Sequence, residues 1–272
     1  MAYVTTHDNV KLYVKDWGAG RPVLLLHGWP LSADSWDDLA LALAAAGFRV
    51  ISYDRRGFGR SDQPWDGYEY DTLADDLAAV IEATGAQDAT LVGFSMGGGE
   101  VARYLSRHAG KQIRQAVLLS SVVLGLLKTD DNPHGAEQAV LDGIIAGLKG
   151  DRPHFLAETF KAFYSGGPLT AEVSAEILEW ARGIALQASL KATVDCVQAF
   201  GTTDFRPDLA AFTLPTLLIH GTGDKMVPIE TSRAVAKAAP QAQLIEYDGA
   251  PHGLQATHKD RLTSDLLAFL RQ

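Results

Sequence analysis

Apolar runs with the length of a β-strand alternate with helical patterns through most of the chain. Residues 10–15 alternate between apolar and polar positions, which is typical of an antiparallel strand with one exposed face. Residues 21–27 form a continuous apolar run, as expected of a strand covered on both faces. Further strands are predicted at residues 48–53, 89–94 and 115–120, and helices at residues 36–46, 72–83 and 96–108. Such repeated strand–helix–strand units predict a mostly parallel sheet with helices on both faces.

The pattern changes near residue 125 and resumes near residue 204. Four helical stretches and no strand are predicted in between, at about residues 135–149, 151–164, 171–183 and 185–199. Afterwards strands are predicted at residues 215–220 and 243–247, and helices at residues 230–238 and 257–270. We interpret the helical insertion as a cap over the site. The prediction is one α/β domain over residues 1–272, with its core at about 1–124 and 204–272 and the cap at about 125–203.

The composition excludes several classes of protein. Hydrophobic residues make up 47% of the chain and charged residues 21%, as in a soluble enzyme with a sizeable core. The net charge of -9, without a cluster of Lys or Arg, argues against binding to nucleic acid or to an anionic membrane. No apolar run is long enough for a membrane span and no signal peptide precedes the domain, so we expect a cytoplasmic protein. The one cysteine, Cys196, lies in an apolar-rich run and is interpreted as a buried thiol.

A serine between a predicted strand and a predicted helix is the first candidate for chemistry. Residues 93–97 read Gly-Phe-Ser-Met-Gly, which matches the G-x-S-x-G pattern in its expected context. A turn of this kind strains the backbone of Ser95, and Gly93 and Gly97 remove the Cβ atoms that would clash. The alternative is a glycine-rich turn that carries a solvated serine. We predict that Ser95 is a nucleophile whose hydroxyl stands above the edge of the sheet.

A serine hydroxyl needs a base to take its proton. Proteins with this strand–serine–helix turn carry their triad in the chain order Ser, Asp or Glu, His. His252 lies in the loop after the strand that ends at Tyr247, and such loops gather at the carboxyl edge of the sheet. His220 closes a strand and is expected to pack inward, whereas His258 is expected to face solvent. We therefore predict His252 as the general base.

Two aspartates compete for the role of the acid that orients this histidine. Asp224 lies in the loop after the preceding strand, where its carboxylate would hold the imidazole in the correct tautomer. Asp248 also falls between the serine and the histidine in sequence, but it is too close to His252 in the same loop to reach around the ring comfortably. We predict Asp224 as the acid.

Backbone N–H groups are predicted to form the oxyanion hole. Met96 begins the helix after the serine, and Trp29 lies in the loop at residues 27–30, which reads His-Gly-Trp-Pro. Pro30 has no N–H and cannot donate. His27 precedes the serine in the chain and is interpreted as a brace for this loop. The predicted oxyanion donors are therefore the N–H groups of Trp29 and Met96.

An apolar substrate pocket is expected beneath the cap. Trp29 and Phe94 neighbour the chemistry in sequence, and Pro30 follows Trp29. Aromatic residues of the cap are further candidates for the lining, with a purely structural role in the core as the alternative. These cap residues are Phe155, Phe160 and Phe163.

The remaining motifs give no reason to expect a cofactor. Residues 54–62 read Asp-Arg-Arg-Gly-Phe-Gly-Arg-Ser-Asp, which we interpret as a network of turns and salt bridges beside the loop at residues 27–30. No G-x-G-x-x-G signature follows the first strand, so no nucleotide is expected. The histidines lack the spacing of metal ligands, so no metal is expected either.

Together these segments resemble the bacterial aryl esterases and cofactor-free haloperoxidases, or perhydrolases, of the α/β-hydrolase superfamily. The resemblance covers nearly the whole chain, cap included, and it implies the α/β-hydrolase fold. It is carried by residues 27–30, 54–62, 93–99, 102–104, 203–205, 220–224 and 250–253.

The resemblance implies hydrolysis of small aryl and alkyl esters through an acyl-enzyme. It also implies perhydrolysis, in which hydrogen peroxide replaces water as the second nucleophile, and a homo-oligomer, because the family is frequently oligomeric. Pro30 is the residue associated within the family with the stronger perhydrolases. Thr222 and Lys225 flank the predicted acid, Asp224, where many relatives carry a more acidic loop. The resemblance therefore does not determine the charge around Asp224.

Other activities on the same fold compete with this interpretation. A lactonase, a γ-lactamase or a C–C bond hydrolase keeps the serine, so these stay open. Dehalogenases and epoxide hydrolases need a carboxylate nucleophile, and position 95 is a serine. A non-catalytic binder is disfavoured because the triad and both oxyanion donors are complete.

Overall fold

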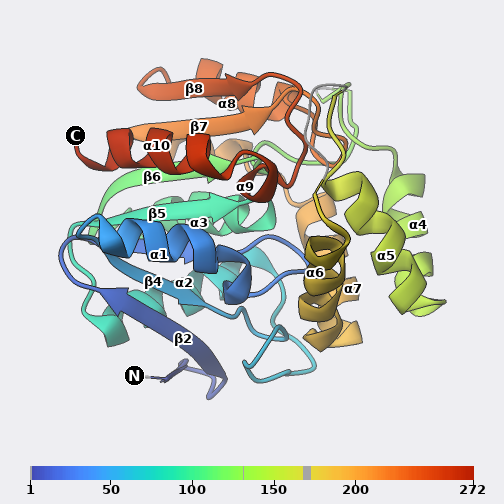
Figure 1. Ribbon diagram of the computed structural model, residues 1–272, viewed down its shortest axis with the longest axis horizontal. Coiled ribbons are helices and arrows are strands. Elements are labelled where there is room, and N and C mark those ends of the chain that lie inside the picture. The colour runs from blue at the N-terminus through green and yellow to red at the C-terminus, as the bar shows by residue number, and fades with distance from the viewer. Residues whose placement is uncertain (1, 131, 168–172) are drawn as a thin grey trace.

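The central sheet has eight strands in the order β1-β2-β4-β3-β5-β6-β7-β8, and the computed structural model describes residues 2–130, 132–167 and 173–272 (Figure 1). The strands are β1 (Tyr3–Thr5), β2 (Lys11–Gly18), β3 (Pro22–Leu26), β4 (Arg49–Tyr53), β5 (Ala89–Phe94), β6 (Ile113–Leu119), β7 (Thr216–Gly221) and β8 (Ala242–Tyr247). Strand β2 is antiparallel to its neighbours β1 and β4, and the remaining pairs are parallel. The predicted mostly parallel sheet is confirmed.

Helices cover both faces of this sheet, as strand–helix–strand units require. In Figure 1, α1 and α10 lie in front of the strands and contact each other, whereas α2 and α3 pack together behind them. The α-helices outside residues 125–203 are α1 (Asp37–Ala45), α2 (Tyr70–Thr84), α3 (Met96–Arg107), α8 (Glu230–Ala238), α9 (Leu254–Thr257) and α10 (Lys259–Leu270). The helix predicted near residues 257–270 is therefore preceded by a separate short helix.

Four more helices stand beside the carboxyl ends of the strands, at the right of Figure 1. They are α4 (Gln138–Lys149), α5 (Arg152–Phe163), α6 (Ala175–Gln187) and α7 (Leu190–Thr202). The described part of residues 125–203 contains no strand, only the isolated bridges Leu127–Ala136 and Thr129–Asn132. The predicted start of the third cap helix, at residues 171 and 172, lies outside the described residues. The division of the chain into core and cap remains a prediction.

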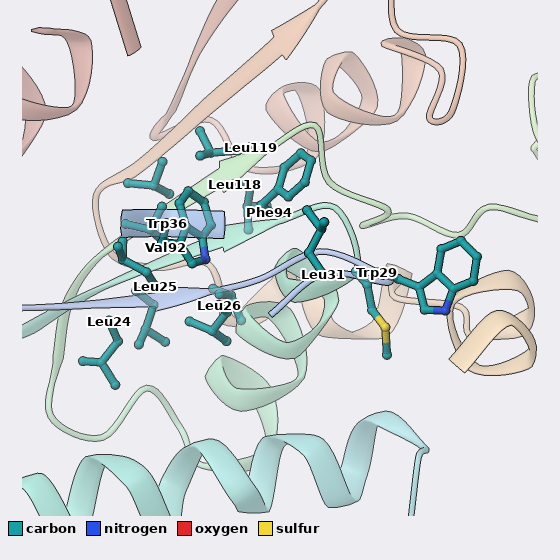
Figure 2. Packing of buried hydrophobic residues seen from close by; sticks show 14 of the residues in the cluster. Leu24, Leu25, Leu26, Trp29, Leu31, Trp36, Val92, Phe94, Leu118 and Leu119 are labelled. Atoms are coloured by element: carbon teal, nitrogen blue, oxygen red, sulfur yellow. The ribbon is translucent and has the colours of Figure 1, made fainter. Parts of the chain in front are cut away.

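The burial of each strand follows its place in the sheet. All five residues of β3 are buried because β3 lies in the middle of the sheet, between β4 and β5, and Figure 2 shows Leu25 beside Val92 of β5. Strand β8 forms an edge and buries only Tyr247 fully. The alternation along β2 gives one buried and one solvated face, as its sequence predicts.

Three short elements are not evident in the sequence pattern, and one of them is the 3-10 helix η1 (Ala33–Trp36) that precedes α1. Strand β1 has only three residues, too few for an alternating pattern to be recognised. A 3-10 helix at Arg206–Ala211 connects the cap to β7, and 3-10 helices are commonly short connectors of this kind. None of these three elements carries a predicted site residue.

Candidate active site

Ser95 occupies a tight turn between β5 and α3. Its backbone has φ 53° and ψ -116°, a conformation that costs a non-glycine residue energy. A Cβ atom on Gly93 would lie 2.5 Å from the carbonyl oxygen of Gly97, and one on Gly97 would lie 2.5 Å from that of Leu26. The N–H of Ser95 donates to the carbonyl of Leu119 at 2.9 Å. Both glycines are therefore required for the strained turn that presents the serine side chain to the pocket.

The structure brings Ser95, His252 and Asp224 into one hydrogen-bonded line. The distance from His252 Nε2 to Ser95 Oγ is 3.0 Å, and that from His252 Nδ1 to Asp224 Oδ2 is 2.7 Å. In the neutral imidazole that suits this geometry, Nδ1–H donates to the carboxylate and Nε2 accepts the serine hydroxyl. The histidine is nearly fully buried, so these two contacts fix its orientation.

Both oxygens of the Asp224 carboxylate accept hydrogen bonds, Oδ2 from His252 and Oδ1 from the backbone. Oδ1 accepts the backbone N–H groups of Met226 and Val227 at 2.8 and 2.9 Å. Burial alone would raise the pKa of Asp224, but the charge of His252 and hydrogen bonds from His220 and His252 outweigh it and hold the pKa well below its usual value. The acid is therefore ionised at neutral pH, as an acceptor for His252 must be.

Asp248, the competing acid, points elsewhere. It lies in the turn after β8, is exposed, and accepts a hydrogen bond from the Thr222 hydroxyl at 3.3 Å. Among the described residues, the structure records no contact between Asp248 and His252. The geometry therefore favours Asp224 as the partner of the histidine.

Two backbone N–H groups beside the serine are free to bind an oxyanion. Within the described residues, the N–H groups of Trp29 and Met96 make no recorded hydrogen bond. The loop that carries Trp29 packs against the serine, since a Cβ atom on Gly28 would lie 3.1 Å from the Cβ of Ser95 and 2.6 Å from the ring of Phe94. The indole of Trp29 turns toward α7 (Figure 2) and donates to the carbonyl of Thr193 at 3.0 Å. This loop therefore joins the serine to the cap.

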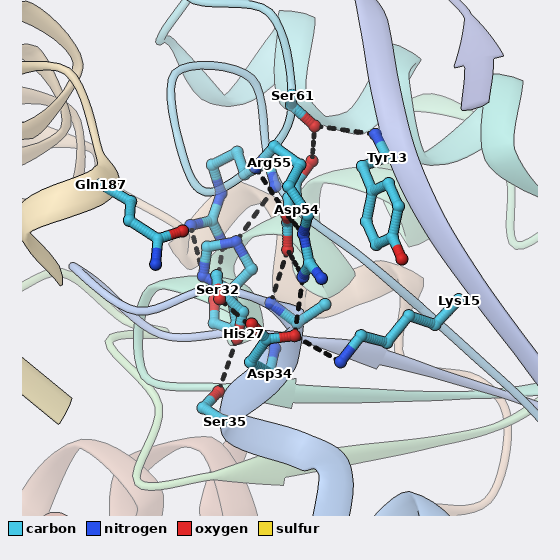
Figure 3. Close-up of polar contacts among 12 residues, drawn as sticks. Tyr13, Lys15, His27, Ser32, Asp34, Ser35, Asp54, Arg55, Ser61 and Gln187 are labelled. Atoms are coloured by element: carbon cyan, nitrogen blue, oxygen red, sulfur yellow. Dashed lines mark hydrogen bonds and ion pairs between the residues drawn. The ribbon is translucent and has the colours of Figure 1, made fainter. Parts of the chain in front are cut away.

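A buried polar network braces the same loop. The Arg55 guanidinium donates to the carbonyl of His27 at 2.6 Å and pairs with Glu100 of α3, which also accepts the Tyr53 hydroxyl at 2.9 Å. The backbone N–H of Arg55 donates to His27 Nε2 at 3.0 Å (Figure 3). Burial and the charge of Arg55 hold the pKa of His27 well below its usual value, so the ring is neutral. His27 is thus a brace, as the sequence predicts, and residues 54–62 supply part of the network.

An apolar cavity of about 90 Å³ opens onto the serine. A single water needs about 10–15 Å³ of such space, so the cavity is large enough for a small organic group. Besides Ser95 and His252, its lining includes the predicted residues Trp29, Pro30 and Phe163. The other lining residues are Val122, Leu126, Ala136, Val140, Leu141, Ile144, Thr159, Phe200, Met226 and Val227. Sequence reasoning missed this second group, because its members on α4, α5 and α7 have the same pattern whether they face the core or a ligand, and the others lie in loops without a pattern.

Three aromatic residues predicted for the pocket are not part of its described lining. Phe94 is fully buried behind the site, where its ring lies 4.9 Å from that of His252 and 5.9 Å from that of Phe163. Phe160 packs on Phe163 at 5.5 Å between ring centres. Phe155 lies against Gly147 of α4, where a Cβ atom would come within 2.3 Å of its ring. Phe155 and Phe160 thus pack between helices, and Phe94 of β5 packs in the core behind the triad.

The other features show no second reactive centre in the described part of the chain. Burial raises the pKa of the Cys196 thiol to about 12, so this cysteine is a buried hydrophobic residue. His258 is half-buried against Tyr247 instead of facing solvent. No cluster of His, Cys, Asp or Glu among the described residues is arranged to hold a metal ion. None of the described helices combines the length and the apolar character that crossing a bilayer requires.

Comparison with known proteins gives matches along the whole chain. A family model described as the alpha/beta hydrolase fold matches residues 21–259. The chain is 42% identical to a non-heme chloroperoxidase of Kitasatospora aureofaciens, with 100% of both chains covered. It is also 42% identical to a bifunctional esterase/perhydrolase of Acinetobacter calcoaceticus, again over 100% of both. A bromoperoxidase structure from Bacillus anthracis superposes with a TM-score of 0.96 at 45% identity, over 100% of this chain and 99% of that chain.

Proposed function

The chain belongs to the α/β-hydrolase fold family, and from this membership and the site geometry we propose that it is a serine hydrolase of small carboxylic esters. The observation that carries the proposal is the line of hydrogen bonds from Ser95 through His252 to Asp224, at an apolar cavity. A nucleophile, a base and an orienting acid in this arrangement are the parts that acyl transfer requires.

In the first half of the proposed reaction, Ser95 Oγ attacks the carbonyl carbon of the ester while His252 Nε2 takes the hydroxyl proton. The N–H groups of Trp29 and Met96 stabilise the negative charge that develops on the carbonyl oxygen. Asp224 stabilises the imidazolium through its contact with Nδ1. The C–O bond to the alcohol then breaks, His252 gives its proton to the leaving oxygen, and an acyl group remains on Ser95.

In the second half, a small nucleophile releases this acyl group. Water attacks the acyl carbon, His252 takes its proton, and the acid leaves as the Ser95 hydroxyl forms again. Hydrogen peroxide in place of water would release a peracid by the same bond changes. The name of the Acinetobacter calcoaceticus relative, a bifunctional esterase/perhydrolase, supports perhydrolysis as a second activity of this chain.

The cavity supports uncharged substrates of modest size. Its wall consists mainly of aliphatic and aromatic side chains. Among the described lining residues other than the serine and histidine, the polar side-chain groups of Thr159 and Trp29 are already bonded, to the carbonyls of Phe155 at 2.8 Å and Thr193 at 3.0 Å. A charged acyl group would lose its hydration here without gaining a partner. We therefore propose short aryl and alkyl esters as the substrate class.

A panel of esters and lactones of varied acyl length and charge, assayed with and without peroxide, tests the proposal. We expect turnover of short uncharged aryl esters, peracid formation when peroxide is present, and poor turnover of charged acyl esters. A preference for lactones would assign the site to lactone opening. Failure to cleave any uncharged ester or lactone would contradict the proposal.

Two further expectations of the sequence remain predictions. The family resemblance predicts a homo-oligomer, which sedimentation of the purified chain would test. The cytoplasmic location that we expect from the sequence is likewise untested. The proposed reaction draws its acid–base chemistry from side chains alone, so no cofactor is expected to change the rate when added.

A further inference from the structure

A second histidine reaches the acid from the side away from the serine. His220, in β7, is fully buried, and its Nε2 lies 3.2 Å from Asp224 Oδ2, the same oxygen that accepts His252 Nδ1. The proposed reaction makes no use of His220. A fully buried histidine that contacts the orienting acid calls for a physical explanation.

The neighbours of His220 determine which ring nitrogen carries a proton. Nε2 faces two acceptors, the Asp224 carboxylate and the carbonyl of Val227 at 3.0 Å, and neither of these groups can donate. Nδ1 lies 2.7 Å from Ser232 Oγ in α8, and that hydroxyl can donate to an unprotonated nitrogen. In either protonation state of the ring, Nε2 therefore carries a proton; its hydrogen bond is to the carbonyl of Val227, and Asp224 Oδ2 lies beside it at 3.2 Å.

We propose that His220 is a positioning residue, which holds the Asp224 carboxylate in place for His252, with Ser232 holding the His220 ring. This proposal rests on the proposed function of the triad. With His220 in place, Oδ2 accepts from His252 and has the positive edge of the His220 ring 3.2 Å away, while Oδ1 accepts the backbone N–H groups of Met226 and Val227. Without it, Oδ2 would lose this polar neighbour and the Val227 carbonyl would lose its donor, so the carboxylate and the backbone that binds it would turn more freely.

Two substitutions of similar polarity separate positioning from simple filling of space. A glutamine amide reaches the place of Nε2, whereas a shorter asparagine amide reaches only the place of Nδ1. We expect His220→Asn to lower kcat for an aryl ester about 10- to 100-fold, the range for losing a hydrogen bond to a buried charge. KM should stay unchanged, because His220 does not line the cavity. His220→Gln should recover most of kcat.

A second variant and a control guard against misfolding. Ser232→Ala keeps the His220 ring but removes the group that holds it, and we expect kcat to fall about threefold with KM unchanged. His108→Asn is the matched control: His108 Nε2 lies 2.8 Å from Asp75 Oδ1, a histidine–aspartate pair that lies away from the cavity. This control should leave kcat unchanged.

The downfield proton signal of His252 Nδ1–H in NMR gives a readout that needs no turnover. It should have the same position in the wild type and in His220→Gln, and a different position in His220→Asn. Equal kcat in the wild type, His220→Asn and Ser232→Ala would overturn the positioning role, as would an unchanged signal in folded His220→Asn. If the wild type cleaves no ester, the proposed function fails, and the NMR comparison still decides the role of His220.

Discussion

The sheet edge formed by the carboxyl ends of the strands and the cap helices α4–α7 contribute to the site by different kinds of interaction. At the sheet edge, directional contacts fix each functional group: Asp224 accepts backbone N–H groups through Oδ1, and His252 is bonded at both ring nitrogens. In the cap, the wall is made of side chains such as Leu141 and Ile144, which contact a ligand only through apolar surface.

This difference has a chemical reason. Proton transfer and attack on a carbonyl depend on distances and angles that directional hydrogen bonds can fix. Apolar contacts are non-directional and select mainly for size and lack of charge. We therefore expect changes at the sheet edge to act on kcat by orders of magnitude, and changes in the cap to act mainly on KM by smaller factors.

The largest effect is expected from Ser95→Ala. Without the hydroxyl no acyl-enzyme forms, so kcat for an aryl ester should fall about 10³-fold or more while the protein stays folded. Steady-state kinetics together with circular dichroism check this. A folded variant that kept most of its activity would remove Ser95, and with it the sheet edge, from the chemistry.

The two aspartates give the next largest contrast. Asp224→Asn should lower kcat at least about 10²-fold, because an amide that donates toward Nδ1 favours the wrong imidazole tautomer. Asp248→Asn should have little effect, since its recorded partner is the Thr222 hydroxyl. Parallel kinetics on both variants decide between the two acids, and the reverse ranking would assign the orienting role to Asp248.

A charge in the cap wall should change KM more than kcat. Ile144 lines the cavity from α4, so Ile144→Asp should raise KM for an uncharged aryl ester about tenfold and leave kcat within a few-fold. Leu41→Asp in α1 is the matched control, because Leu41 is 66% exposed and away from the cavity. A fall in kcat as large as that of Asp224→Asn would erase the distinction between the two regions.

The smallest effect concerns Pro30, where the two regions meet. Proline fixes its own φ and restricts Trp29 before it, so we expect it to hold the Trp29 carbonyl as an acceptor for peroxide attacking the acyl-enzyme. One hydrogen bond made only in that transition state is worth about 1 kcal/mol, or several-fold in rate. Pro30→Leu should lower the ratio of peracid formation to ester hydrolysis by that factor. An unchanged ratio would show that Pro30 does not select the nucleophile.

The sequence predicts the sheet edge far better than the cap, for a physical reason. Ser95, Asp224 and His252 each follow a strand, and parallel strands bring their carboxyl ends to one edge, so local patterns were enough to place them together. The inward packing of His220 was also expected, but its contact with Asp224 depends on how the loop after β7 turns back toward the strand.

The cavity wall depends on packing that a pattern does not encode. Phe160 and Phe163 lie one helical turn apart on α5, yet only Phe163 belongs to the described lining. Phe200 and Val122 line the same cavity from elements distant in sequence. Apolar residues at helical spacing show which face is buried, but not whether a neighbouring side chain or a ligand fills the space beside them.

The most direct test of Ser95 as the nucleophile is covalent labelling of the purified chain with an organophosphonate, followed by peptide mapping in a mass spectrometer. We predict one adduct per chain, carried by the peptide that contains Ser95, loss of ester hydrolysis in proportion to labelling, and no adduct on Ser95→Ala. An adduct on another residue, or full labelling that leaves ester hydrolysis intact, would contradict the proposed role of Ser95.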